Sequence, residues 1–151
     1  MKKDISASGP FKTRDYREAD YQAVRRLWEE TGLSHPVRGD DEKTILETLS
    51  TGGKLILLEE EKTGMICGTS WMTCDGRRIH LHHFGILPGF QGKGLSKSLL
   101  EASLEYVKEK NLQVKIEVHR DNFKAINLYN KYGFQKLGEY DVYIIRNINE
   151  I

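Results

Sequence analysis

The chain has 151 residues, enough for one domain with a single core, and a formal net charge of +1 with both signs mixed along its length. This balance gives no broad cationic surface of the kind that binds nucleic acid or anionic membranes. Cys67 and Cys74 are the only cysteines, too few for a disulfide framework, and no segment has the apolar run of a signal peptide or a membrane span. The composition therefore predicts a soluble, cytoplasmic protein with two free thiols.

Hydrophobic periodicity and turn residues divide the chain into predicted helices and strands. Residues 1–10 are small and polar, and we expect a flexible segment there, ahead of a single domain over residues 11–151. The order of elements predicts an α/β domain with helices packed on a mixed sheet. In the first part we expect a strand at 11–16, a helix at 18–31 ended by Gly32, a loop at 33–39, and a helix that Asp40 caps and that ends at Gly52-Gly53. In the second part we expect strands at 54–59, 65–74 and 77–87, a helix at 94–110, a strand at 114–118, a helix from Asp121 or Asn122 to Gly133, and a closing strand pair at 134–137 and 139–145.

The segment from Gln91 to Ser96 joins a predicted strand to a predicted helix and is suited to hold phosphate. Gly92 and Gly94 let the backbone approach a ligand closely, and the first amides of the helix lack intrahelical acceptors, so they attract anions. A purely structural turn is the alternative. A Walker loop does not fit, because Leu87 occupies a position where that loop needs glycine. A dinucleotide-binding fingerprint does not fit either, because Lys97 occupies a position where that motif needs glycine.

Two motifs resemble those of the GNAT superfamily of acetyl-CoA-dependent N-acetyltransferases, and the resemblance covers nearly the whole chain. The first is the family's Gln/Arg-x-x-Gly-x-Gly/Ala loop, matched by residues 91–96 after the aliphatic Ile86-Leu87-Pro88, with Ser96 where the family has Gly or Ala. The second is the segment 121–134, which resembles the family's Asn-x-x-Ala-x-x-Leu-Tyr-x-Lys-x-Gly-Phe at every characteristic position. One predicted helix and one predicted strand separate the two motifs, as in the family.

The resemblance implies a GNAT-type fold: a mixed, mostly antiparallel sheet of about seven strands, flanked by four helices and splayed between strands 4 and 5. It implies acetyl-CoA as cosubstrate and no metal, with the pyrophosphate on the loop amides and the pantetheine arm beside the preceding strand. That strand carries a bulge in the family, a geometry that Gly85 tolerates. The implied cofactor-binding residues are Phe84, Gly85, Ile86, Gln91, Gly92, Lys93, Gly94, Leu95, Ser96 and Asn122.

Acetyl transfer to an amine needs a group that accepts a proton, because an alkyl amine with a pKa of about 10 is mostly protonated at neutral pH. His80 and His82 share one face of the predicted strand with Phe84, whereas alternation places His83 on the opposite face. The His-Leu-His spelling resembles the arylalkylamine acetyltransferases, where paired histidines help to deprotonate the amine. The alternatives are structural histidines, deprotonation through water or an acidic residue, and a zinc site that lacks a third ligand on that face.

The departing thiolate needs a proton, and Tyr129 is the predicted donor. Asn122, Ile126 and Tyr129 lie at helical positions i, i+4 and i+7, so one helix face presents an amide and a phenol to the coenzyme. The alternative is a core aromatic and a simple helix cap. The predicted catalytic residues are thus Tyr129, His82 and His80.

These observations predict an N-acetyltransferase that moves an acetyl group from acetyl-CoA to a primary amine by direct attack on the thioester. The alternative is a non-catalytic acyl-CoA-binding sensor or interaction module. Binding to nucleic acid or a membrane is not expected, because Lys93, Lys97 and Lys108 are ordinary charges on a helix surface.

The acceptor amine is not identified by the sequence. The resemblance implies that residues 33–38, with His35, and the closing strands near Tyr140 and Tyr143 shape the acceptor pocket. Their residue types fit a small metabolite, an antibiotic, a peptide N-terminus or a lysine side chain. The sequence also leaves a homodimer open.

Overall fold

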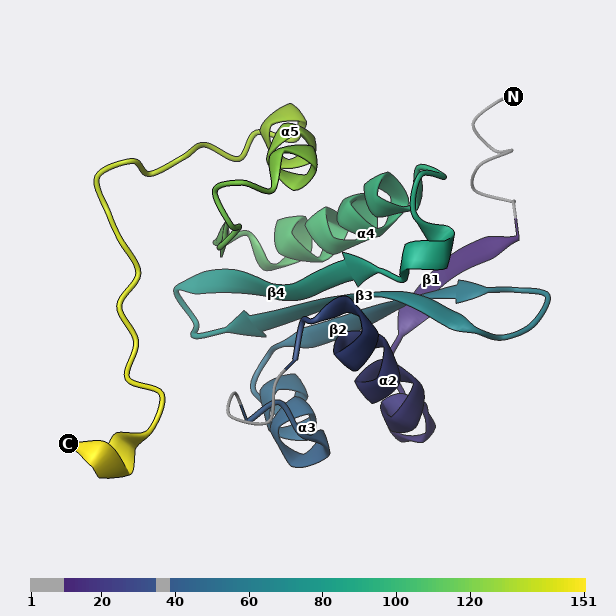
Figure 1. Cartoon of the computed structure of the whole chain (residues 1–151), viewed down its shortest axis with the longest axis horizontal. Coiled ribbons are helices and arrows are strands. Elements are labelled where there is room, and N and C mark those ends of the chain that lie inside the picture. The colour runs from purple at the N-terminus through teal and green to yellow at the C-terminus, as the bar shows by residue number, and fades with distance from the viewer. Residues whose placement is uncertain (1–9, 35–38) are drawn as a thin grey trace.

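Five strands form one sheet in the computed structural model, which describes residues 10–34 and 39–151. The strands are β1 (Phe11–Asp15), β2 (Lys54–Glu60), β3 (Ile66–Cys74), β4 (Arg78–Ile86) and β5 (Gln113–Ile116), and they lie in that order. The first four pair antiparallel with their neighbours, and β5 runs parallel to β4. A parallel neighbour requires a crossover connection, which the helix between β4 and β5 provides (Figure 1).

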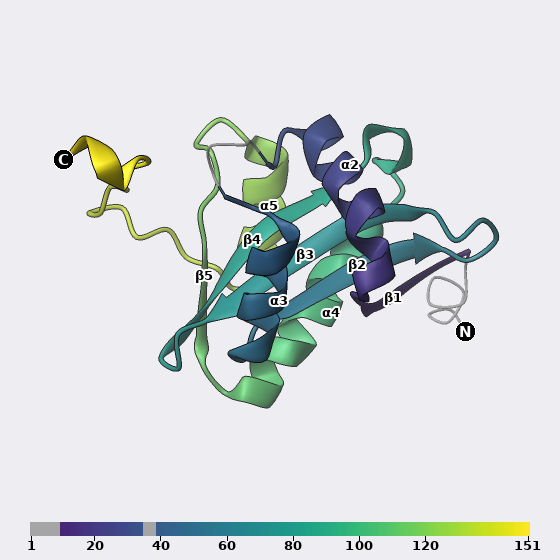
Figure 2. The same cartoon turned by 90° about the horizontal axis from the view of Figure 1, so that it is seen from below.

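Four α-helices among the described residues cover the two faces of this sheet. They are α2 (Tyr21–Thr31), α3 (Glu42–Ser50), α4 (Leu95–Lys110) and α5 (Phe123–Lys131). In Figure 1, α2 and α3 lie below the sheet and α4 and α5 lie above it, and Figure 2 shows α2 and α3 crossing the lower face. The central strands β2 and β3 are consequently buried on both faces, and each buried aliphatic side chain contributes about 1.5–3 kcal/mol. This core supports the end of β4, where the predicted site residues lie.

Two helix ends follow their predicted signals: Gly32 ends α2 in the left-handed region with φ 73°, and the Asn122 side chain caps α5. The helix predicted over 18–31 begins as a 3-10 turn at Glu18–Asp20, so that α2 itself starts at Tyr21. The helix α3 ends at Ser50, ahead of the predicted Gly52-Gly53, and Asp41 caps it instead of the predicted Asp40 by accepting a hydrogen bond from the Thr44 amide. The side chain of Asp40 contacts a residue of β4, described below.

The predicted closing strand pair at 134–137 and 139–145 is wrong, so the described sheet has five strands and not about seven. Residues 135–151 follow α5 with no ladder to the sheet, and every one of them is exposed. In Figure 1 this yellow segment stands away from the other elements. The β-branched and aromatic residues of 139–145 favour a strand, but strand propensity does not determine which sheet edge the segment pairs with.

Some predictions fall on residues outside the described ranges. They include the flexible N-terminal segment, of which only Pro10 is described, and residues 35–38 of the loop before α3. Cys67 and Cys74 are free thiols, as predicted. Among the described residues, no helix has the length and apolar character needed to cross a membrane.

Candidate active site

The strands β4 and β5 separate beyond Leu81. Their parallel pairing runs from Arg78 with Gln113 to Leu81 with Ile116, and β4 then continues to Ile86 without a β5 partner in the described residues. This is the predicted splay between strands 4 and 5. A cavity of about 320 Å³ opens there. Five of the predicted site residues line it, namely His80, His82, Phe84, Asn122 and Tyr129.

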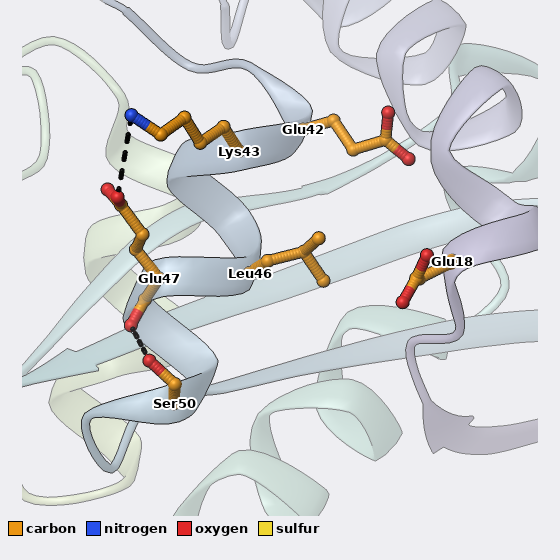
Figure 3. Close-up of a pocket in the computed structure, with 6 residues that line it drawn as sticks. All are labelled: Glu18, Glu42, Lys43, Leu46, Glu47 and Ser50. Carbon is orange, nitrogen blue, oxygen red and sulfur yellow. Dashed lines mark hydrogen bonds and ion pairs between the residues drawn. The ribbon is translucent and has the colours of Figure 1, made fainter.

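A larger hollow of about 550 Å³ lies on the surface between α3 and the 3-10 turn that precedes α2 (Figure 3). Its wall consists of ordinary helix-surface side chains: Lys43 pairs with Glu47 one turn away at 3.7 Å, and the Ser50 hydroxyl donates to the Glu47 carbonyl. None of the predicted site residues lines it. We therefore place the candidate active site at the separation of β4 and β5.

A β-bulge shapes β4 next to the cavity. Thr69 of β3 pairs with Gly85 and Trp71 pairs with His82, so two residues of β4 oppose one of β3. His83 in the bulge has a φ of 41°, which is uncommon outside glycine. The buried Thr69 hydroxyl holds this backbone in place by donating to the His83 carbonyl at 2.7 Å while it accepts from Trp28 Nε1 at 2.9 Å.

Gly85 was predicted to tolerate the geometry of the bulge, but the structure gives this glycine a different role. The positive φ of the bulge belongs to His83, whereas a Cβ on Gly85 would lie 2.8 Å from Leu33 Cδ1. Glycine at this position lets the end of the α2 segment pack directly on β4. Leu33 is thereby a wall of the cavity.

The bulge overturns the predicted direction of two side chains. His83 was expected opposite His80 and His82, yet its ring lies 5.0 Å from that of Trp71, and the His82 ring lies 6.1 Å from the same indole. The inserted residue breaks the period-2 alternation on which the expectation rested. Phe84, expected beside the two histidines, packs edge-to-face on Tyr129 of α5 with the ring centres 6.0 Å apart.

The rings of His80 and His82 lie close together, with their centres 3.9 Å apart and their planes tilted by 39°. His82 Nε2 lies 2.8 Å from the Thr73 hydroxyl. Burial, together with the neighbouring His80, His83 and Lys115, lowers the pKa of His82 to about 3.

The side chain of His80 is partly exposed and has a carboxylate beside it. Burial lowers the pKa of His80 as well, but Glu117 opposes that shift from 3.8 Å, measured from Nε2 to the carboxylate Oε2. Both imidazoles are consequently neutral near pH 7. Glu117 is a cavity residue that the sequence reasoning missed, because it follows β5 and only the register of β5 with β4 brings it to His80.

Tyr129 enters the cavity from α5. Its side chain is 6% exposed and contacts the rings of Phe84 and Phe134. Burial raises the pKa of Tyr129 to about 12, so the phenol stays protonated throughout the physiological range. Its hydroxyl makes no hydrogen bond to any other described residue. Asn122 caps the same helix by accepting from the Ala125 amide.

The Gly-rich loop stands just beyond the end of β4. Gly92 and Gly94 have φ angles of 80° and 77°, and Gly94 is the N-cap of α4. No side chain caps this helix end and no acidic residue occurs in its first turn, which leaves the N-terminal amides available to an anion. The side chain of Gln91 donates to the Ile86 carbonyl at 2.9 Å and fastens the loop to the end of β4.

The structure thus brings the predicted residues together in two groups at the same end of β4. His80, His82, Phe84, Asn122 and Tyr129 line the cavity, and residues 91–96 form the adjacent loop at the start of α4. An uncapped 16-residue helix with left-handed glycines before it suits a diphosphate, so the residues present fit the phosphate end of acetyl-CoA.

Comparison with known proteins identifies relatives of this fold. Residues 14–134 match the family model described as Acetyltransferase (GNAT) family. A GNAT family acetyltransferase from Staphylococcus aureus Mu50 superposes with a TM-score of 0.73 at 18% identity, over 87% of this chain and 88% of that one. Glucosamine-6-phosphate N-acetyltransferase from Arabidopsis thaliana gives 0.70 at 19% identity, over 93% and 99%.

A third structure carries the coenzyme. It is yncA from Salmonella typhimurium with its cofactor acetyl-CoA, which superposes with a TM-score of 0.68 at 17% identity, over 84% of this chain and 80% of that one. At these identities the structural likeness establishes the fold, and the family model spans most of the chain. The chain belongs to the GNAT family of acetyltransferases.

Proposed function

We propose that this protein transfers the acetyl group of acetyl-CoA directly to a primary amine, and that the two substrates meet in the cavity between β4 and β5. The observation that carries the proposal is that residues from both faces of the sheet line one cavity. His82 pairs with Trp71, whose indole donates to Thr48 of α3, so the histidines lie on the side of α2 and α3. Tyr129 enters from α5 on the other side.

The separation of the strands supports a meeting of two substrates. The coenzyme, which supplies an acetyl group activated as a thioester, would have its diphosphate on the amides of residues 91–96. The pantetheine arm of the coenzyme would run along β4 from Phe84 to Ile86, where the edge of β4 has no β5 partner among the described residues. The amine would approach from the side of the two histidines, so attack needs no acetylated enzyme residue.

The pKa values give the two histidines different roles. Moving a proton from an alkylammonium with a pKa of about 10 to an imidazole with a pKa of about 3 costs roughly 9–10 kcal/mol. His82 therefore acts as a hydrogen-bond acceptor that orients the amine. His80 takes the proton, because Glu117 stabilises its charged form and leads toward solvent.

Tyr129 assists the departure of sulfur. Its pKa of about 12 exceeds that of a thiol, about 8.5, so its main contribution is a hydrogen bond to the sulfur as the C–S bond breaks and negative charge develops there. The ammonium loses two protons in the whole reaction. One is balanced by the proton that the CoA thiolate takes up to become a thiol, and the other leaves through His80.

The test is an acceptor panel assayed with the full chain and acetyl-CoA. The panel contains a hexosamine phosphate, a peptide with an N-terminal alanine, a lysine peptide, an arylalkylamine and a polyamine. Released CoA is measured by chromatography, because the partly exposed Cys74 would react with a thiol reagent. Acetylated product with at least one amine, formed about 100-fold more slowly by Tyr129→Phe, supports the proposal. Calorimetric binding of acetyl-CoA with no product from any amine would support the sensor instead.

A further inference from the structure

We infer that Trp28 and Thr69 are positioning residues for acetyl transfer: through one chain of hydrogen bonds they aim the backbone amide of Phe84 at the oxygen of the bound thioester. The inference rests on the proposed function, because it names the residues that hold a donor for that reaction. Neither Trp28 nor Thr69 is among the residues that line the cavity, so both would act through the backbone of β4.

The chain of hydrogen bonds can run in one direction only. The indole N–H of Trp28 can only donate, and it lies 2.9 Å from the Thr69 hydroxyl oxygen. The His83 carbonyl can only accept, and it lies 2.7 Å from the same hydroxyl. The single hydroxyl proton of Thr69 therefore points at the His83 carbonyl. Because the hydroxyl accepts one bond while it donates the other, each bond polarises and strengthens its neighbour.

Both side chains of this chain are packed in the core. Thr69 is fully buried and Trp28 is 1% exposed. The indole of Trp28 stacks on that of Trp71, with the ring centres 5.3 Å apart. Threonine is branched at Cβ, which restricts the rotation of its side chain and fixes the place of its hydroxyl. The helix α2 thereby holds one backbone carbonyl of β4 from below the sheet.

The carbonyl that α2 holds belongs to the bulge of β4. His83 has a φ of 41°, a conformation that persists in a non-glycine residue only where its neighbours hold it. Neither His83 nor Phe84 has a partner in the register of β3 with β4. A peptide outside the ladder can rotate so that its carbonyl and its amide exchange directions. The bond from Thr69 selects one of these two orientations.

The selected orientation sends the Phe84 amide to the coenzyme side of the sheet. The peptide between His83 and Phe84 is trans, so its carbonyl and its amide point in opposite directions. The carbonyl points to the Thr69 hydroxyl, on the face that α2 covers. The amide consequently points away from α2, toward the face on which α5 lies (Figure 1). Tyr129 enters the cavity from that same face.

A fixed amide on this side can stabilise the charge that develops during transfer. As the amine attacks, the C–N bond forms and negative charge gathers on the carbonyl oxygen until the C–S bond breaks. With the sulfur beside Tyr129, as proposed, the oxygen on the same carbon lies within reach of β4. A donor that is already aimed at this oxygen needs no reorganisation at the moment of reaction. Trp28 and Thr69 would supply that aim.

The test observes this one peptide directly. His83-Phe84 is the only His-Phe pair in the chain, so ¹³C-carbonyl-labelled histidine with ¹⁵N-labelled phenylalanine gives a single signal in a carbonyl–amide correlation spectrum. In the wild type, acetyl-CoA should move the Phe84 amide proton downfield relative to CoA. Thr69→Val removes the hydroxyl, keeps the shape of the side chain and should abolish this difference. Thr69→Ser keeps the hydroxyl and should retain it.

Thr48→Val is the matched control. The Thr48 hydroxyl also accepts from an indole, Trp71 Nε1 at 3.0 Å, and donates to a carbonyl at 2.8 Å, but that carbonyl belongs to Ile45 in α3. Both valine variants should lose stability in urea unfolding. Only Thr69→Val should lower kcat, by about tenfold or more, with the dissociation constant of CoA unchanged. The amine for this assay is one that the acceptor panel shows to be acetylated.

The wild-type spectrum decides the matter even if Thr69→Val does not fold. A Phe84 amide that does not respond to the acetyl group would overturn the inference, and so would a Thr69→Val enzyme with the kcat of the wild type. Either result leaves the proposed function standing as long as the wild type acetylates an amine. A wild type that binds acetyl-CoA and acetylates no amine would overturn the proposed function, and this inference with it.

Discussion

The His83 ring and the Asp40 carboxylate meet at 2.8 Å, from Nε2 to Oδ2, across 43 residues of sequence. Their side chains are 12% and 11% exposed. The contact joins the bulge of β4 to the residue just ahead of the α3 cap. It therefore connects the wall of the cavity to the helices on the proposed acceptor side.

Asp40→Ala should weaken both the fold and the binding of the amine. Loss of this carboxylate removes a charge-assisted partner of a largely buried imidazole, which costs about 1–3 kcal/mol. We expect KM for the amine to rise several-fold with the dissociation constant of acetyl-CoA unchanged. Asp41→Ala is the matched control, since it removes the cap of α3 at about 1 kcal/mol without touching His83. Urea unfolding and steady-state kinetics measure both. An equal rise of KM in the control would rule out a specific role for Asp40.

Gly94→Ala should weaken acetyl-CoA binding about tenfold. Gly94 has a φ of 77°, where a side chain costs roughly 1–2 kcal/mol, and the first helical amides follow it directly. Nothing lies within 4 Å of a Cβ built on Gly94, so the effect would come from the backbone conformation and not from crowding. Gly89→Ala serves as the control, because that glycine has open space and no left-handed φ. Equal affinities of the two variants in calorimetry would show that the loop conformation does not matter.

Tyr129→Phe should lower kcat about 100-fold with little change in acetyl-CoA affinity. The substitution removes the hydroxyl and keeps the ring that contacts Phe84 and Phe134. Tyr132→Phe is the control on the same helical segment, since its hydroxyl donates to Glu101 and does not line the cavity. An unchanged kcat in Tyr129→Phe would exclude the phenol from the chemical step.

The pH dependence of kcat should separate the two histidines. A base must be neutral to accept a proton, so kcat should rise as pH rises through the pKa of His80, which burial holds below 6.5. His80→Gln should abolish this acidic limb. His82→Gln should lower kcat and keep the limb, because a group with a pKa of about 3 does not titrate in that range. A limb that persists in His80→Gln and disappears in His82→Gln would reverse the two roles.

The sequence predicted most of the fold because its signals are local. Gly32, Asn122 and the apolar periodicity of α4 act within a few residues, and the elements they define appear where expected. The closing strands failed for the opposite reason. Residues 139–145 are strand-forming types, but whether they pair within the chain depends on distant strand edges that a local pattern does not describe.

The candidate site shows the same difference between residues placed by local signals and residues placed by distant contacts. His80 and His82 could be paired from their spacing, and Tyr129 from a motif, because each needs only a regular strand or helix. His83 and Glu117 could not be placed, since one depends on an inserted residue in β4 and the other on the register of a parallel strand. The sequence predicted Asp40 as the cap of α3. The next residue, Asp41, has the same side chain and fills that role in the structure.

A crystal structure of the full chain with CoA bound is the decisive measurement for the proposed coenzyme site. We expect the diphosphate on the amides at the start of α4 and the sulfur in the gap between β4 and β5, about 3–3.5 Å from the Tyr129 hydroxyl. A diphosphate elsewhere, or a sulfur out of reach of that phenol, would contradict it.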